Sequence, residues 1–260
     1  IVDLARGRDL AQADLLPLLQ AADLVLLGEQ HDNPHHHQRR GTLIAQLGPA
    51  AVVVAEHLPA GGRVGPGADV RSRLVAAGFD AQAWGWPVHE GLFAPILAAG
   101  VPLLGGNAAQ ALVRQVAREG PSAWPATVRQ ALEAAPLDAA GQAALDQALS
   151  DGHCGQLPAA RVPAMRAAQR LRDATMALAL LGCGGRPAVL VAGNGHVGLD
   201  HGVAQLLQRL RPQAHIVSIG FAEPGAPLQG APYSLLWVTP AVRRQDPCAG
   251  FKLPAVRAQV

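Results

Sequence analysis

The chain has 260 residues, of which 50% are hydrophobic, and it carries a formal net charge of +2. This length and apolar content are sufficient for one sizeable folded core and exclude a disordered chain. The charge is small and evenly spread, which excludes nucleic acid and an anionic membrane surface as partners selected by charge.

Six apolar runs of strand length recur along the chain, at residues 24–28, 51–56, 101–106, 188–193, 215–219 and 235–239. Helical or mixed segments separate the first three runs, and this alternation predicts a parallel sheet with helices on both faces. After the first run, Asn33 is suited to an N-cap and Pro34 to a first helical position, which predicts a helix over 34–47. Two further helices are expected over 70–77 and 92–99.

Residues 108–181 show no strand pattern, and Ala, Leu, Arg and Gln dominate them. We therefore predict an α/β fold, with a mostly parallel sheet flanked by helices and a helical subdomain inserted between the third and fourth strands. The corresponding domain boundaries are 1–107 and 183–260 for the sheet domain and 108–182 for the helical subdomain. No run reaches the roughly 18 apolar residues of a membrane span, and the start at Ile1 is typical of a trimmed chain whose export signal has been removed.

Polar side chains follow three of the predicted strands where each strand ends. Glu29 and His31 follow the first strand, Glu56 ends the second, and His196 follows the fourth. Each alone is more commonly a helix cap or a surface group, but the carboxyl ends of parallel strands share one edge, where ligands bind. Together, His31, His196, Glu29 and Glu56 predict a site for Zn²⁺, Mn²⁺ or Co²⁺, or an acid and base pair. Two carboxylates in such a crevice are expected to repel, so that the pKa of one rises.

A second candidate site lies in the helical insertion, where His153 and Cys154 occupy a loop flanked by glycines. This pair is able to ligate a borderline metal or haem iron, although an inert buried cysteine beside a surface histidine explains it equally well. The next helix carries Gln169, Arg172 and Asp173 on one stripe, which indicates either polar groups directed at a partner or a solvated helix edge. The three cysteines, odd in number and widely spaced, allow at most one disulfide.

The motifs taken together resemble the ChaN-like haem-binding lipoprotein family over nearly the whole chain. This family is a branch of the group containing Tiki, TraB and the erythromycin esterases, whose shared mark is a pair of Gly-x-x-His motifs. The matching segments are Gly28-Glu29-Gln30-His31-Asp32-Asn33-Pro34, Glu56, Trp84, Gly106-Asn107, the stripe from Gln169 to Ala177, and Ala192-Gly193-Asn194-Gly195-His196-Val197.

The resemblance implies a haem-binding protein of bacterial iron uptake in the periplasm or outer membrane. It also implies a homodimer sharing haem, haem-uptake receptor or transporter components as partners, and a lipid anchor that this chain does not include. Family members hold haem iron through a tyrosine, and Tyr233 is the single tyrosine here, although it is more simply a residue flanking an edge strand. Otherwise His153 and Cys154 are the candidate iron ligands, with Arg172 as a partner for the propionates.

Two functions of different class follow. The first is haem binding without turnover, with haem on the helical subdomain rather than in the crevice. The alternative is a metal-dependent hydrolase of the Tiki or erythromycin-esterase type, in which His31, His196 and one carboxylate hold the ion. In that case Glu29 or Glu56 activates water.

Overall fold

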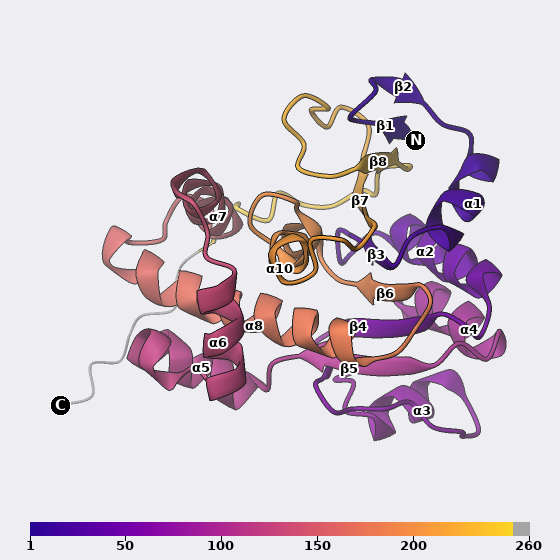
Figure 1. Ribbon diagram of the computed structural model, residues 1–260, viewed down its shortest axis with the longest axis horizontal. Helices are drawn as coiled ribbons and strands as arrows, with labels where there is room; N and C mark the ends of the chain where they lie inside the picture. Colours follow the sequence, from indigo (N-terminus) through magenta and orange to yellow (C-terminus); the bar gives the residue numbers. More distant parts are fainter. Residues whose placement is uncertain (252–260) are drawn as a thin grey trace.

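The computed structural model describes residues 1–251, and its framework is an eight-stranded sheet with the strand order β2-β1-β8-β7-β3-β6-β4-β5 (Figure 1). The strands are β1 (Val2–Asp3), β2 (Arg8–Asp9), β3 (Leu24–Leu27), β4 (Val52–Pro59), β5 (Leu103–Asn107), β6 (Ala188–Val191), β7 (Ile216–Ala222) and β8 (Leu235–Val238). Strands β3 to β8 are parallel to their neighbours, whereas β1 pairs antiparallel with β2 and β8. The predicted mostly parallel sheet is confirmed, and only the two-residue strands β1 and β2, too short to show a pattern, were not predicted.

Ten α-helices accompany the sheet in the described residues. They are α1 (Leu15–Gln20), α2 (Pro34–Leu47), α3 (Val70–Ala76), α4 (Glu90–Ala98), α5 (Gln110–Glu119), α6 (Ala126–Ala134), α7 (Ala139–Gly152), α8 (Val162–Gly182), α9 (Asn194–Val197) and α10 (Val203–Leu210). Three short 3₁₀ helices, Gln12–Asp14, Gly120–Ala123 and Ala159–Arg161, lie between them. The helices predicted over 34–47, 70–77 and 92–99 all form, and residues 108–181 are helical throughout their ordered elements.

Each face of the sheet has its own hydrophobic core, because successive side chains of a strand point to opposite faces. Val25 and Leu27 of β3 pack with the helices α1 to α4. Leu24 and Leu26, which alternate with them, pack with α5, α6, α8 and α10. The central strand is therefore apolar at every position, as expected for a strand covered on both faces.

The helical insertion does not stand apart from the sheet. Helix α8 contacts β4, β5 and β6 and also packs against α5 and α10 (Figure 1). Its residue Met176 approaches Gly106 of β5, where an added Cβ would lie 3.3 Å from the Met176 side chain. The long helix thus brings side chains from the insertion to the carboxyl edge of the sheet.

Helix α2 is fixed at its start and along its side. The Asn33 side chain accepts a hydrogen bond from the His35 backbone N–H at 2.9 Å, as predicted for the N-cap. Gly41 allows a close approach to α4, since a Cβ at this position would lie 2.3 Å from the Gly91 carbonyl oxygen. This packing places His89, the residue before α4, beside His37 of α2, with ring centroids 4.3 Å apart.

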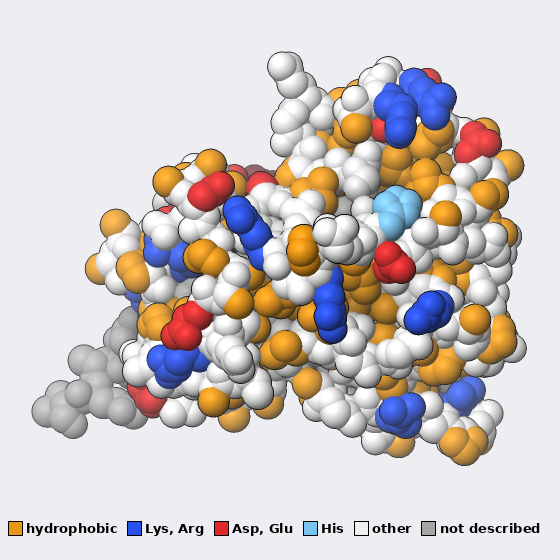
Figure 2. Space-filling model, in the orientation of Figure 1, with side chains coloured by type: hydrophobic (Ala, Val, Ile, Leu, Met, Phe, Trp, Pro, Cys, Tyr) orange, Lys and Arg blue, Asp and Glu red, His pale blue; other side chains and the backbone are white. Residues whose placement is uncertain are grey.

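Among residues 1–251, none of the helices combines the length and hydropathy that crossing a membrane would require. Basic and acidic side chains are scattered over the face shown in Figure 2.

Candidate functional site

The polar groups that follow the predicted strands meet at one edge of the sheet. Strand β6 lies between β3 and β4, so the carboxyl ends of these three strands are side by side, as predicted. The Gly193 backbone N–H donates to Glu56 Oε2 at 2.7 Å, and a Cβ on Gly193 would lie 2.8 Å from His31 Nε2. Glycine at this turn therefore leaves room for the His31 ring between the loops that follow β3 and β6.

Glu29 is the centre of one cluster, in which basic side chains surround a fully buried carboxylate. Its Oε1 atom lies 2.5 Å from His31 Nδ1 and 3.0 Å from His57 Nε2. Its Oε2 atom pairs with the Arg40 guanidinium and lies 3.1 Å from His37 Nδ1. We call this group the Glu29 cluster; it also includes His89, whose Nε2 is 3.9 Å from Oε1.

Four members of this cluster, His37, Arg40, His57 and His89, were not among the predicted site residues, and the sequence carried a signal for three of them. His37 and Arg40 are three residues apart on α2, which places them on one face of the helix. His57 follows Glu56 directly in β4 and therefore faces the opposite side of the sheet. His89 lies in the connection before α4 and showed no periodic signal, because only the packing of α4 on α2 brings it to the site.

Burial keeps three histidines of the Glu29 cluster neutral, namely His37, His57 and His89. Removal from water lowers the pKa of His37 to about 4 and that of His57 well below its usual value. The pKa of His89 falls for the same reason, and the charges of nearby basic groups add to the effect. Burial also lowers the pKa of Arg40 to about 9, so the guanidinium remains charged at neutral pH. The buried part of the cluster therefore consists of one ion pair and three uncharged imidazoles.

Glu56 and His196 form a second cluster on the other side of the sheet edge. Glu56 Oε1 lies 3.3 Å from His196 Nε2, and His196 Nδ1 lies 2.6 Å from Asp173 Oδ1. The Gln169 side-chain nitrogen is 3.2 Å from the same His196 nitrogen. We call these residues the His196 cluster. Two residues of the polar stripe on α8, Gln169 and Asp173, are thus directed at His196.

The charges of the His196 cluster stabilise one another. Burial opposes ionisation of Glu56, yet the charge and hydrogen bond of His196 hold its pKa well below the usual value. Burial likewise opposes protonation of His196, but Glu56 and Asp173 raise its pKa to about 10. The expectation that repulsion raises the pKa of one crevice carboxylate is therefore wrong for Glu56. Imidazoles, rather than a second carboxylate, are its nearest charged neighbours.

Four donors in the Glu29 cluster could hold a metal ion. One ligand atom each from Glu29, His31, His57 and His89 lies within 4.8 Å of the others. Two of these residues, Glu29 and His31, belong to the predicted metal set. The other two predicted ligands, Glu56 and His196, lie outside this group and pair with each other in the His196 cluster.

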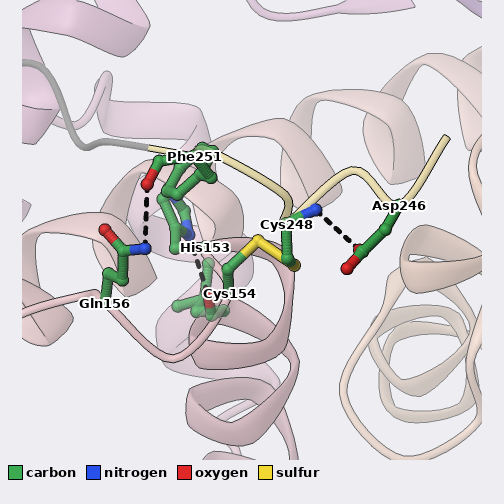
Figure 3. The surroundings of a disulfide bond; sticks show 7 residues. His153, Cys154, Gln156, Asp246, Cys248 and Phe251 are labelled. Carbon is green, nitrogen blue, oxygen red and sulfur yellow. Dashed lines mark hydrogen bonds between the residues drawn. A yellow bond between two sulfur atoms is a disulfide. The ribbon is translucent and has the colours of Figure 1, made fainter.

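The predicted haem ligands lie elsewhere. Cys154 forms a disulfide with Cys248, 94 residues further along the chain (Figure 3), so the prediction of a Cys154 thiolate ligand is wrong. Neither partner showed a spacing signal. His153, at the end of α7, has its Nδ1 2.7 Å from the Leu149 carbonyl oxygen, and its Nε2 has no hydrogen-bond partner within residues 1–251.

Tyr233 and Arg172 lie nearer the sheet. Strand β8, which follows Tyr233, pairs on both sides, so Tyr233 does not flank an edge strand. Its hydroxyl is 3.4 Å from the Asn194 carbonyl oxygen, and burial raises its pKa to about 12. Arg172 donates to Asn107 Oδ1 at 3.0 Å, beside the crevice.

Comparison with known proteins gives a consistent result. A family sequence model described as haem-binding uptake, Tiki superfamily, ChaN matches residues 15–207. Among solved structures, the chain is similar to ChaN of Campylobacter jejuni, described as showing cofacial haem binding. The TM-score is 0.71 and the identity 18%, over 90% of this chain and 94% of that chain. An erythromycin esterase mutant in its open conformation matches at a TM-score of 0.45 and 15% identity, over 90% of this chain and 80% of that chain. No curated protein sequence matches.

Proposed function

Because the chain belongs to the haem-binding uptake family of the Tiki superfamily that includes ChaN, we propose that it binds haem in bacterial iron uptake. The match over residues 15–207 carries this proposal, since it spans both the sheet edge and the helical insertion. The ChaN structure with the same fold is described as binding haem cofacially. We extend this arrangement to the present chain as a homodimer that presents two haems to each other.

For the haem site, we propose the helical insertion, with His153 as the iron ligand. The Leu149 carbonyl accepts from His153 Nδ1, which fixes the tautomer and leaves Nε2 to bind iron, as in many haem and metal sites. In the Glu29 cluster, by contrast, His31 Nδ1 lies 2.5 Å from Glu29 Oε1, and the side chains of His37, His57 and His89 are buried. A porphyrin edge has no comparable access to the buried imidazoles beneath it.

Cations for the haem propionates are available along α8. Arg166 is occupied by a bidentate pair with Asp146, at 2.7 and 2.6 Å. Among residues 1–251, the side-chain acceptors of Arg172 are the neutral Asn107 and Gln110, so its charge is available to pair with a carboxylate. We therefore propose Arg172 as a propionate partner for a haem that reaches from the insertion toward the sheet edge.

The Cys154–Cys248 disulfide supports a location in the periplasm or at the outer membrane, because disulfides persist in oxidising compartments. We propose that the precursor is lipid-anchored there and exchanges haem with components of a haem-uptake receptor or transporter. Fractionation of cells that express the full precursor, with and without a substituted lipidation cysteine, tests this localisation.

Haem binding is tested by titrating the purified chain with hemin and recording the Soret band, together with the mass in solution by light scattering. We expect saturable binding that shifts the chain toward a dimer. His153→Ala should shift or abolish the band, while His31→Ala should leave it nearly unchanged. Loss of the band in His31→Ala alone would place the iron ligand at the sheet edge, and absence of saturable binding would refute the proposal.

A second candidate function, a metal-dependent hydrolase, is favoured by the His196 cluster. Asp173 orients His196, and Glu56 lies on its other ring nitrogen, an arrangement suited to activating water and protonating a leaving group. Hydrolysis of nitrophenyl esters in the presence of Zn²⁺, Mn²⁺ or Co²⁺, lost in Glu56→Gln, would support this candidate. Equal rates for the wild-type and Glu56→Gln proteins would rule out this role.

A further inference from the structure

We propose that Glu29, His31, His57 and His89 form a binding site for one divalent transition-metal ion. The site supplies three imidazole nitrogens and one carboxylate oxygen, all within 4.8 Å of one another. It lies beneath the sheet edge, on the face covered by α2 and α4, and shares no residue with the proposed haem ligands. The inference therefore stands whether or not the chain binds haem.

The three imidazoles converge on a single oxygen atom. The distances to Glu29 Oε1 are 2.5 Å from His31 Nδ1, 3.0 Å from His57 Nε2 and 3.9 Å from His89 Nε2. Tetrahedral donors with metal bonds of ~2.1 Å lie ~3.4 Å apart. The widest separation in the group, 4.8 Å, therefore needs to close by about 1.4 Å, and the 2.5 Å between His31 Nδ1 and Glu29 Oε1 needs to open by about 0.9 Å.

Hydrogen bonds within the protein leave several buried nitrogen atoms of these four residues without a partner among residues 1–251. Both ring nitrogens of His89 are buried without a hydrogen-bond partner among residues 1–251, and so is His57 Nδ1. A buried polar atom without a partner costs ~1–3 kcal/mol. Glu29 Oε1 has only two lone pairs and already faces His31 and His57, so it offers nothing to His89. A metal ion among the four donors would engage a His89 nitrogen.

The surroundings of the site suit an ion of borderline softness. Arg40 and His37 hold Glu29 Oε2 from the other side, which orients Oε1 toward the three imidazoles. Neutral imidazoles bind Zn²⁺, Co²⁺, Mn²⁺ or Fe²⁺, whereas Mg²⁺ and Ca²⁺ prefer oxygen ligands. The His31 side chain is 47% exposed while the other three are buried, so His31 is the ligand at the entrance.

Cobalt binding to the full chain, stripped of metal with a chelator, tests the site. We expect one Co²⁺ per chain, with visible absorption bands of a four- or five-coordinate ion that added Zn²⁺ removes and Mg²⁺ does not. Loss of a ligand in His89→Gln should weaken binding at least as much as the ~10–100-fold that loss of an outer-sphere partner costs. His201→Gln replaces a buried histidine outside the group and should bind Co²⁺ like the wild type.

Two outcomes would overturn the proposal. One is the absence of stoichiometric Co²⁺ binding by the wild-type chain; the other is wild-type affinity in both His31→Gln and His89→Gln. If circular dichroism shows that His89→Gln is unfolded, His31→Gln decides the matter, because His31 is half exposed. Hemin titration of the same variants separates the two sites, since His89→Gln should bind haem normally.

Discussion

Replacing Arg40 with methionine should destabilise the protein severely. Arg40 is fully buried, and its guanidinium pairs with the equally buried Glu29 carboxylate. Methionine retains most of the apolar stem, so the change removes the charge rather than the packing. Removing one partner of a buried ion pair costs ~3–5 kcal/mol, because the remaining charge is left without compensation.

This magnitude is a large part of the ~5–15 kcal/mol that stabilises a typical protein. It corresponds to a fall in melting temperature on the order of 10 °C. The free energy of unfolding is measured by urea denaturation at pH 7, followed by far-ultraviolet circular dichroism and tryptophan fluorescence. Arg39→Met is the matched control, since Arg39 is exposed and its guanidinium makes two weak contacts, one 3.4 Å from Gln12 and one 6.0 Å from the centroid of the Trp237 ring. We expect a change of ~0.5 kcal/mol or less for this control.

The double variant Glu29→Gln with Arg40→Met tests whether the unpaired Glu29 charge causes the loss of stability in Arg40→Met. If an uncompensated Glu29 charge is responsible, neutralising it should recover much of the lost stability, and the two changes should be far from additive. A loss below ~1 kcal/mol in Arg40→Met, or a double variant destabilised by the sum of the single effects, would refute the argument.

Three further outcomes are expected. Cys154→Ser with Cys248→Ser should lower stability by ~2–4 kcal/mol, because the disulfide closes a long loop, and reductant should then no longer change the melting temperature. Stability should fall as pH drops below about 6.5, because burial lowers the pKa of His36 to about 4 and the unfolded chain binds a proton that the folded chain does not. This difference lowers the free energy of unfolding by ~3 kcal/mol at pH 4. Urea titrations of His36→Gln should therefore show a shallower pH dependence than those of the wild type. Gly41→Ala should cost ~1–3 kcal/mol because its Cβ would meet the Gly91 carbonyl oxygen at 2.3 Å, while Gly91→Ala, whose nearest contact is 3.5 Å, should be nearly neutral in the same assay.

Patterns among residues close in sequence predicted most of the helices and strands. Uniformly apolar runs predicted the six longer strands, and Asn33 with Pro34 predicted the start of α2, because these signals depend on neighbours in sequence. The polar strand ends predicted one crevice, since parallel strands share a carboxyl edge whatever their order. The family resemblance, carried by the paired Gly-x-x-His motifs, agrees with the family match over residues 15–207.

Only the tertiary structure shows that the polar groups at the sheet edge form two separate clusters. Glu56 and His57 are adjacent in sequence, but the alternation of side chains in β4 sends them to different clusters on opposite faces of the sheet. Because Glu56 pairs with His196 rather than with Glu29, its pKa is lowered and not raised. His89 joins the Glu29 cluster only because α4 packs on α2, and Cys154 meets Cys248 across 94 residues. Such contacts depend on how separate elements pack in three dimensions, and no periodic pattern along the chain encodes them.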